Sequence, residues 1–274
     1  MNIILSIAGS DPSGGAGIQA DLKTITTLGC YGAAAITAIT CQNSQGVSHC
    51  LPLSPQLVVD QVSAVLSDMA PSHIKIGMTA SAEIISALAK CLDDFTGEII
   101  FDPVLKASAG QSLLGSDSPE AMVPLLQRVT VLTPNIMELA ILSGQEINNE
   151  EEAKRAAETL LDKYPNIKAL CIKGGHLCEE KKEVIDILLV KAGSHGNLQI
   201  SEVRHPRRQT QNSHGTGCTF ASAFAALHAQ LMDYQKAFES AVLYVDSLLE
   251  MSKDEKIGVG IGPLQHFRMS NFKS

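Results

Sequence analysis

Short runs of apolar residues alternate with amphipathic stretches along almost the whole chain. The runs have the length and the bounding residues of buried strands, and we predict strands over 3–8, 33–40, 73–77, 98–102, 130–133, 169–173 and 184–190. Between them, apolar residues recur at helical spacing, as in the sets Leu57, Val58, Val62, Val65 and Leu66, and Ile84, Ile85, Leu88, Ala89 and Leu92. The alternation predicts an α/β fold whose parallel sheet is covered by helices on both faces.

The C-terminal part of the chain departs from this alternation. Residues 215–231 and 233–249 have the pattern of two successive helices with no strand between them. We find no linker-like segment and no internal repeat, and we therefore expect one domain over residues 1–274. Because ligands of open α/β sheets bind beyond the carboxyl ends of the strands, we expect the functional residues in the segments that follow the strands.

The composition is that of a folded, acidic protein. Hydrophobic residues make up 45% of the chain, and 21 Lys and Arg against 29 Asp and Glu give a net charge of −8. This balance argues against nucleic acid or an anionic membrane as a partner. No apolar stretch approaches the ~20 residues of a membrane helix, and residues 1–8 fit a first strand better than a secretory signal. The seven cysteines include no C-x-x-C pair, so we expect a reduced, cytoplasmic protein.

The segment after the first strand, residues 9–21, is rich in glycine. Four glycines within nine residues permit tight turns and a close approach to a ligand. From Gly15 onward it matches a dinucleotide-binding variant, G-x-G-x-x-A, but that fingerprint needs an acidic residue about 20 positions later, and none occurs in 22–59. Asp11 and Asp21 favour a polar substrate that is neutral or cationic. A flexible turn without a ligand is the alternative.

The segment after the second strand carries three carboxamides, Gln42, Asn43 and Gln45. A carboxamide offers both a donor and an acceptor, so it can recognise the edge of a heterocycle that offers the same pair. A plain turn built from Asn, Ser and Gly explains the composition equally well.

Residues 133–138 start another candidate loop. Thr133 ends a predicted strand, and Pro134 suits the first position of a helix. Asn135 and Glu138 would then share one face of the helix start, where Glu138 could hold a hydrated magnesium ion. The alternative is a capping box in which Thr133 is the cap.

Residues 212–218 give the sharpest signal, because small residues precede a long helix. Backbone N–H groups of Gly215, Thr216 and Gly217, with the positive end of the helix dipole, can form a site for a phosphoryl group. The same field lowers the pKa of a thiol, so Cys218 is a candidate proton acceptor. A small buried cysteine that only packs the turn is the alternative.

Lys173 ends a predicted strand and is followed by two glycines and His176. The lysine can reach phosphate oxygens, although a solvated turn is an equally good interpretation. The histidines do not have metal-binding spacing, and we expect no protein-held zinc.

Together these loops resemble one family. The motifs are Ala8-Gly-Ser-Asp-Pro-Ser-Gly-Gly-Ala-Gly-Ile-Gln-Ala-Asp-Leu-Lys-Thr24, Gln42-Asn43, Lys75-Ile-Gly-Met78, Thr133-Pro-Asn135, Lys173-Gly-Gly-His176, His214-Gly-Thr-Gly-Cys-Thr219 and Gly260-Ile-Gly-Pro-Leu-Gln-His-Phe267. They are similar, in order and over nearly the whole chain, to bacterial hydroxymethylpyrimidine/phosphomethylpyrimidine kinases of thiamine biosynthesis. The resemblance implies a ribokinase-like three-layer α/β/α fold with a central, mostly parallel sheet, a homodimer, and the use of ATP and Mg²⁺. The implied substrates are 4-amino-5-hydroxymethyl-2-methylpyrimidine and then its monophosphate.

The resemblance also implies roles for individual residues. Asp21 and Gln42 would hold the aminopyrimidine, and Gly9 and Met78 would shape its pocket. The remaining roles concern phosphate: an anion hole at Gly215, Thr216 and Gly217, Cys218 beside the hydroxymethyl group, Asn135 and Glu138 orienting magnesium and phosphates, and Lys173 neutralising charge.

One loop departs from the family pattern. Ser108 occupies the position where the family commonly has Lys, and a lysine occurs earlier, at Lys106. Either Lys106 reaches the same region or the contribution of this loop is lost, and we therefore leave Lys106 out of the principal site residues.

Three alternatives stay open. A pyridoxal kinase would share the Gly-Thr-Gly-Cys turn and the chemistry. A nicotinamide oxidoreductase would need the acidic residue that 22–59 lacks. A non-catalytic, vitamin-binding regulator would keep the ring pocket without needing 215–218 or Glu138.

Overall fold

The computed structural model describes residues 1–105, 119–176, 182–192 and 197–269. Within these ranges the chain forms a nine-stranded sheet of order β3-β2-β1-β4-β5-β6-β7-β8-β9. The bounds are β1 (Ile3–Ser10), β2 (Tyr31–Asn43), β3 (Gly46–Pro52), β4 (His73–Ile76), β5 (Glu98–Phe101), β6 (Val131–Leu132), β7 (Ala169–Ile172), β8 (Glu183–Ala192) and β9 (Asn197–Pro206). Strands β2-β1-β4-β5-β6-β7 are parallel, while β3 and the β8–β9 hairpin pair antiparallel at the two ends.

Each of the seven predicted strands is present, and β3 and β9 are the two that the sequence pattern missed. β3 is mostly exposed or half-buried, and exposed positions alternate with half-buried ones along most of β9. Both strands therefore lack the continuous apolar run that marks a strand buried on both faces.

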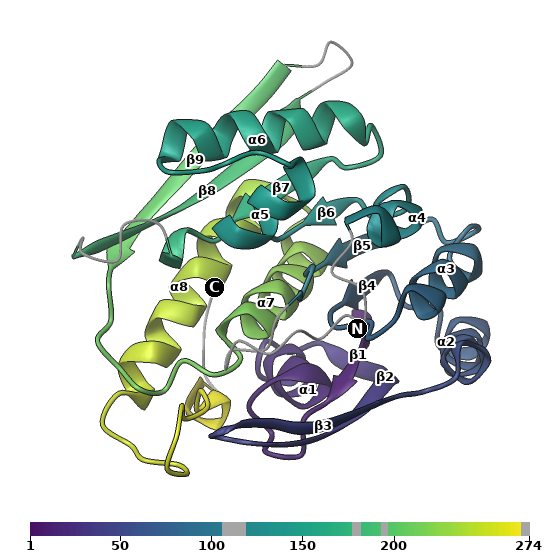
Figure 1. The fold of residues 1–274 in the computed structure, drawn as a ribbon, viewed down its shortest axis with the longest axis horizontal. Coiled ribbons are helices and arrows are strands. Elements are labelled where there is room, and N and C mark those ends of the chain that lie inside the picture. The colour runs from purple at the N-terminus through teal and green to yellow at the C-terminus, as the bar shows by residue number, and fades with distance from the viewer. Residues whose placement is uncertain (106–118, 177–181, 193–196, 270–274) are drawn as a thin grey trace.

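Helices cover both faces of the sheet, as predicted (Figure 1). Helices α1 (Gly17–Thr27), α7 (Thr216–Leu231) and α8 (Tyr234–Ser252) pack on one face. The other face carries α2 (Pro55–Met69), α3 (Ala82–Cys91), α4 (Val123–Leu126), α5 (Ile136–Ser143) and α6 (Glu150–Lys163). Short 3₁₀ turns are η1 (Pro119–Met122), η2 (Gly174–His176) and η3 (His266–Met269). Strand alternation explains the division, because Leu5 and Ile7 face the second layer and Ile4 faces the first.

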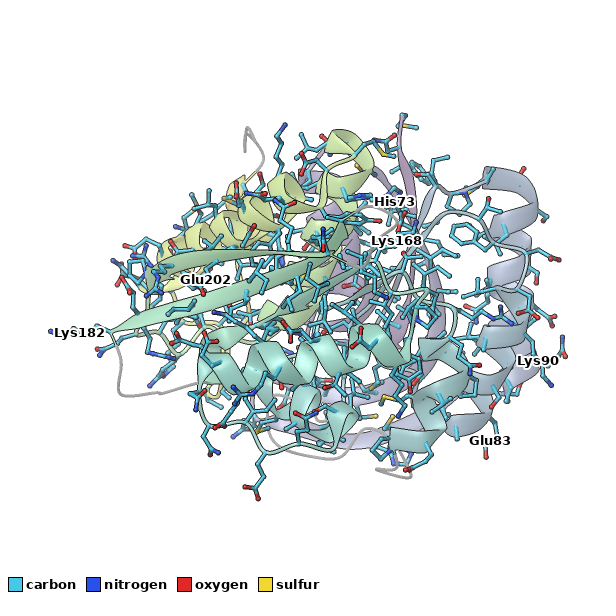
Figure 2. The ribbon with its side chains drawn as sticks, turned by 90° about the horizontal axis from the view of Figure 1, so that it is seen from above. His73, Glu83, Lys90, Lys168, Lys182 and Glu202 are labelled. Atoms are coloured by element: carbon cyan, nitrogen blue, oxygen red, sulfur yellow. The ribbon has the colours of Figure 1, made fainter. Side chains whose placement is uncertain are left out.

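Helix α3 shows how local sequence builds these layers. The Ser81 side chain caps its first turn by accepting the N–H of Ile84, and Ile84 and Leu88 lie fully buried on one face. Glu83 in the first turn and Lys90 in the last suit the helix dipole and project outward at the edge of the molecule (Figure 2).

Helices α7 and α8 follow each other directly, as predicted, and pack side by side. Most of α7 is buried, since it lies between α8, α1 and the sheet. This packing fixes the N-terminus of α7 against the loop that follows β1. Within the described ranges, no helix has both the length and the apolar character to cross a membrane.

Candidate active site

A cavity of about 870 Å³ opens at the edge of the sheet where the parallel strands end. It is lined by residues that follow β1, β4, β5, β6 and β7 and by the N-terminus of α7, as the position of ligands in open α/β sheets predicts. Of the residues predicted for the site, all but Asp21 line this cavity: Gly9, Gln42, Met78, Asn135, Glu138, Lys173, Gly215, Thr216, Gly217 and Cys218.

The turn at 215–218 forms one wall of the cavity. Gly215 is the N-cap of α7 at a φ of 84°, and among the described residues no side chain caps the first turn. A Cβ at Gly215 would lie 1.8 Å from the carbonyl oxygen of Gly15, so the turn packs directly on the glycine loop after β1. The uncapped N–H groups at this helix end suit an anion.

Lys173 faces this turn. A Cβ at Gly217 would lie 3.3 Å from Lys173 Nζ and 3.7 Å from Asp102 Oδ2, so any side chain there would enter the space between the turn and the ammonium group. Lys173 Nζ donates to Asp102 Oδ1 at 2.6 Å and lies 3.8 Å from Glu138 Oε2. Burial disfavours the charged form, but the two carboxylates outweigh it and raise the lysine pKa.

Asn135 and Glu138 form a capping box at the start of α5. Asn135 Oδ1 accepts the N–H of Glu138 at 2.9 Å, and Glu138 Oε2 accepts the N–H of Asn135 at 2.8 Å. The cap is thus Asn135 and not Thr133, and Pro134 precedes the helix instead of starting it. The same two residues also line the cavity, so the cap and the candidate binding site coincide.

The carboxylates fit a hydrated magnesium ion. Burial raises the pKa of Glu138, Lys173 lowers it and Asp102 raises it, and the net result is a pKa of about 7. Two carboxylates flanking one lysine offer few protein ligands, and Mg²⁺ typically takes one or two carboxylates, with waters and phosphate oxygens completing its shell. Among the described residues no group of three or more His, Cys, Asp or Glu side chains is placed to hold a metal.

Gln42, Gly9 and Met78 line another part of the cavity. A Cβ at Gly9 would lie 2.2 Å from the terminal methyl of Met78, so the glycine leaves room for the methionine side chain. The Gln42 carboxamide lies 3.1 Å from Nε2 of His214, and that nitrogen donates to Asp11 Oδ2 at 2.9 Å.

Asp11 organises the glycine loop. Its carboxylate accepts N–H groups from Ser13, Gly15 and Ala16 in addition to the bond from His214. Burial opposes the charged form, but these hydrogen bonds prevail and lower the pKa of Asp11 to about 2. Asp11 is therefore ionised at neutral pH and ties the loop after β1 to the residue that precedes the turn at 215–218.

The position of Asp21 corrects the prediction that it contacts the ring. Asp21 is fully buried and does not line the cavity. Each of its carboxylate oxygens accepts a hydrogen bond from Lys75 Nζ at 2.9 Å. The carboxylate also accepts hydrogen bonds from the hydroxyl groups of Ser6 at 2.6 Å and Ser222 at 2.7 Å. The network joins β1, α1, β4 and α7 beneath the cavity and leaves no exposed carboxylate oxygen for a ligand.

The prediction of a lowered pKa for Cys218 is wrong for the ligand-free protein. Burial is the largest effect and raises the pKa of the thiol to about 11. Lys75 lowers it, whereas Asp21 and Asp102 raise it. The helix end therefore does not produce a thiolate at neutral pH.

Sequence reasoning gave no site role to Lys75, Asp102 or His214. Asp102 and Lys75 lie in or directly after buried apolar strands, where a charged side chain needs a specific partner, and this signal could have found them. Lys106 and Ser108 lie outside the described residues.

A glycine turn at a helix N-terminus that faces a lysine across a cavity, at the carboxyl edge of a mostly parallel sheet, defines a ribokinase-like small-molecule kinase. Solved structures support this class. The pyridoxal kinase of Staphylococcus aureus, in complex with AMP-PCP and pyridoxal, has a TM-score of 0.81 at 32% identity, covering 97% of this chain and 94% of that one. The phosphomethylpyrimidine kinase of Clostridium difficile 630 has a TM-score of 0.73 at 34% identity, covering 90% and 99%.

Sequence comparisons give the family. The family model described as phosphomethylpyrimidine kinase matches residues 11–265. The hydroxymethylpyrimidine/phosphomethylpyrimidine kinase of Rhizobium meliloti is 40% identical over 267 residues, which are 97% of each chain. The chain belongs to the phosphomethylpyrimidine kinase family, and the predicted resemblance and fold are confirmed.

Proposed function

We propose that this chain transfers the γ-phosphoryl group of ATP to the hydroxymethyl oxygen of 4-amino-5-hydroxymethyl-2-methylpyrimidine, and then phosphorylates the monophosphate to the pyrophosphate. The observation that carries this function is the single cavity in which the turn at 215–218 faces Lys173 while Gln42 lines the same space. Relatives that match almost the whole chain bear the name of this activity.

The phosphoryl group is received between the turn and Lys173. As the new O–P bond forms and the bond to ADP breaks, charge spreads over three equatorial oxygens. The N–H groups of Gly215, Thr216 and Gly217 at the helix end and the Lys173 ammonium group stabilise this charge. Gly217 has no side chain, and so the group can approach both.

Glu138, with Asp102 beside it, would hold a hydrated Mg²⁺ bound to the nucleotide. When bound, the ion neutralises charge on the phosphate oxygens. Asp102 also holds the Lys173 ammonium group at 2.6 Å, which keeps this cation at the cavity wall before any ligand arrives.

Gln42 recognises the ring, because its carboxamide can pair with the adjacent donor and acceptor of an aminopyrimidine edge. His214 and Asp11 restrict the carboxamide. Cys218 lies beside the reacting oxygen and accepts its proton. Since the thiol pKa is about 11, the cations around the bound phosphates must outweigh the negative charge of the phosphates and lower the pKa of Cys218 in the complex.

The resemblance to the family also implies a homodimer. A cytoplasmic location is supported by the sequence, in which the seven cysteines include no C-x-x-C pair.

The decisive experiment measures ADP release with the pyrimidine alcohol, its monophosphate, pyridoxine and pyridoxal in parallel. We expect turnover of the first two to exceed that of the pyridoxal-type alcohols. Faster turnover of pyridoxal would replace this function with that of a pyridoxal kinase, and ring binding without ADP release would indicate a regulator. Gly217→Val should remove transfer in the same assay, whereas Ala64→Val, which adds a branched side chain to the exposed face of α2, should not.

A further inference from the structure

The segment after α8 runs between two loops of the site (Figure 1). On one side it is bound to Ser44, at the tip of the β2–β3 hairpin. The N–H groups of Val259 and Gly260 donate to Ser44 Oγ at 3.2 and 3.1 Å, and the N–H of Ile261 donates to the Ser44 carbonyl oxygen at 2.8 Å. Three consecutive backbone donors thus converge on one residue, two positions after Gln42.

On its other side the segment is bound to the loop that precedes α7. Gly262 donates its N–H to the carbonyl oxygen of Gln211 at 2.9 Å, and its own carbonyl oxygen accepts the N–H of His214 at 3.0 Å. His214 directly precedes the turn at 215–218, and its ring contacts Gln42. The segment therefore bridges the ring-binding hairpin and the phosphoryl-binding turn.

The bridge is close-packed on both sides. A Cβ at Gly260 would lie 2.1 Å from the Ser44 carbonyl oxygen, and a Cβ at Gly262 would lie 1.8 Å from Asn212 Oδ1. A larger residue at Gly260 would displace the backbone of the hairpin, and a larger residue at Gly262 would displace the side chain of Asn212 in the loop before α7. The proposed function assigns no role to the C-terminal Gly-Ile-Gly-Pro motif. Its two glycines are needed because neighbouring atoms leave no room for a side chain at either position.

We propose that residues 259–262 act as a positioning strap, which sets the distance between the Gln42 carboxamide and the turn at 215–218. Ser44 is the positioning residue at the hairpin end. This inference rests on the proposed function, because it assumes that Gln42 holds the ring while the turn holds the phosphoryl group. Loosening the strap moves Gln42 away from the ring and leaves Lys173 and the turn in place.

The first test is Ser44→Ala, which removes the hydroxyl acceptor of two hydrogen bonds at a partly exposed site. We expect the KM for the pyrimidine alcohol to rise about three- to tenfold, with kcat and the KM for ATP within about twofold of wild type. Ser67→Ala, an exposed serine whose hydroxyl bonds only to its own helix α2, is the control and should change none of these. An unchanged pyrimidine KM in Ser44→Ala would overturn the strap.

The second test is Gly260→Ala, which inserts a methyl group against the Ser44 backbone. The pyrimidine KM should rise more than in Ser44→Ala, by about tenfold or more. Gly29→Ala, at a φ of 77° with no neighbour within 4 Å, is strained without touching the strap and controls for lost stability. If Gly260→Ala and Gly29→Ala changed the pyrimidine KM equally, the change would reflect a general loss of stability and would contradict the proposal. If the wild-type protein phosphorylates only pyridoxal, the proposed function fails, and the same KM comparison with pyridoxal still tests the strap.

Discussion

Two lysine–aspartate pairs in this molecule have the same chemistry and different surroundings. Lys75 and Asp21 form a pair at 2.9 Å in which both side chains are fully buried. Lys173 and Asp102 form a pair at 2.6 Å in the cavity wall, where 17% of the lysine side chain is exposed. The first pair is enclosed by the protein, and the second borders the space that receives a ligand.

The difference lies in what completes each pair. Two serine hydroxyls satisfy the remaining capacity of Asp21, so its pair forms a closed network. The neighbour of Lys173 is a second carboxylate, Glu138, at 3.8 Å, and the lysine therefore sits in an excess of negative charge that magnesium or a substrate can rearrange. We infer that the buried Lys75–Asp21 pair, which neutral donors complete, stabilises the fold. The Lys173–Asp102 pair, which borders the cavity, takes part in the reaction. We call them the closed pair and the open pair.

Replacing Lys75, the lysine of the closed pair, should give the largest effect, a loss of stability. In Lys75→Met the Asp21 carboxylate loses its only cation in the network, and we expect the free energy of unfolding to fall by about 3–5 kcal/mol. Urea unfolding followed by circular dichroism measures this. Lys168→Met, which removes a half-exposed partner of Glu98, should cost under about 1 kcal/mol.

The double variant Lys75→Met with Asp21→Leu sharpens this result, since it removes both charges. It should recover a large part of the lost stability. A Lys75→Met protein as stable as wild type would show that the pair is not the closed structural unit described above.

Replacing Lys173, the lysine of the open pair, should lower turnover while the protein still folds. In Lys173→Met, the transferring phosphoryl group loses a cation, and we expect kcat to fall about 100- to 1,000-fold. Stability should change less than in Lys75→Met, because the Lys173 side chain is 17% exposed and Asp102 lines the cavity, whereas Lys75 and Asp21 are fully enclosed. ADP release and thermal unfolding are measured on the same sample, with Lys168→Met as the control for turnover. If Lys173→Met unfolded as readily as Lys75→Met, the distinction between the two pairs would be lost.

Sequence reasoning found the elements whose signal is local. The strands that are buried on both faces have continuous apolar runs, and the glycine turn at 215–218 marks a helix start by composition alone. The closed pair lies beyond such reasoning, because Asp21 and Lys75 are 54 residues apart and meet only when α1 packs against the sheet. The same holds for the Cys218 thiol, since the helix end predicts a lowered pKa and burial, which decides the sign, depends on the packing of the whole site.

Residues of both pairs act electrostatically on the Cys218 thiol, and replacing Cys218 should give the next largest effect. In Cys218→Ala we expect kcat to fall about 100-fold, because a positioned proton acceptor contributes at least this much, while nucleotide binding persists. Since burial raises the thiol pKa to about 11, the thiolate fraction of the free protein grows with pH, and kcat/KM of the wild type should rise between pH 7 and 10. The rise should be absent in Cys218→Ala and in Cys218→Ser. Near-normal turnover in the alanine variant would remove the proton-acceptor role.

Protonation of Glu138 should give the smallest effect, a pH-dependent change in the KM for magnesium–ATP. Because burial raises the pKa of Glu138 to about 7, the carboxyl group is largely protonated below that pH, and the KM for magnesium–ATP should rise up to about tenfold for each pH unit below 7. Glu138→Gln should remove this dependence. Glu152→Gln is the matched control, since Glu152 occupies the same position after the cap of the exposed helix α6, away from the cavity.

Stability of the ligand-free protein should respond to Glu138 with the opposite sign. A carboxyl group whose folded pKa lies above its unfolded value favours the folded state in its protonated form, so this contribution is present below about pH 4.5 and is lost as pH rises to 7. Wild type should therefore lose stability relative to Glu138→Gln over that interval while its affinity for magnesium–ATP increases. Parallel changes in both quantities would show that Glu138 acts only as a helix cap. If stability falls while affinity for magnesium–ATP rises, ionisation of Glu138 destabilises the protein over the same pH range in which it promotes ligand binding.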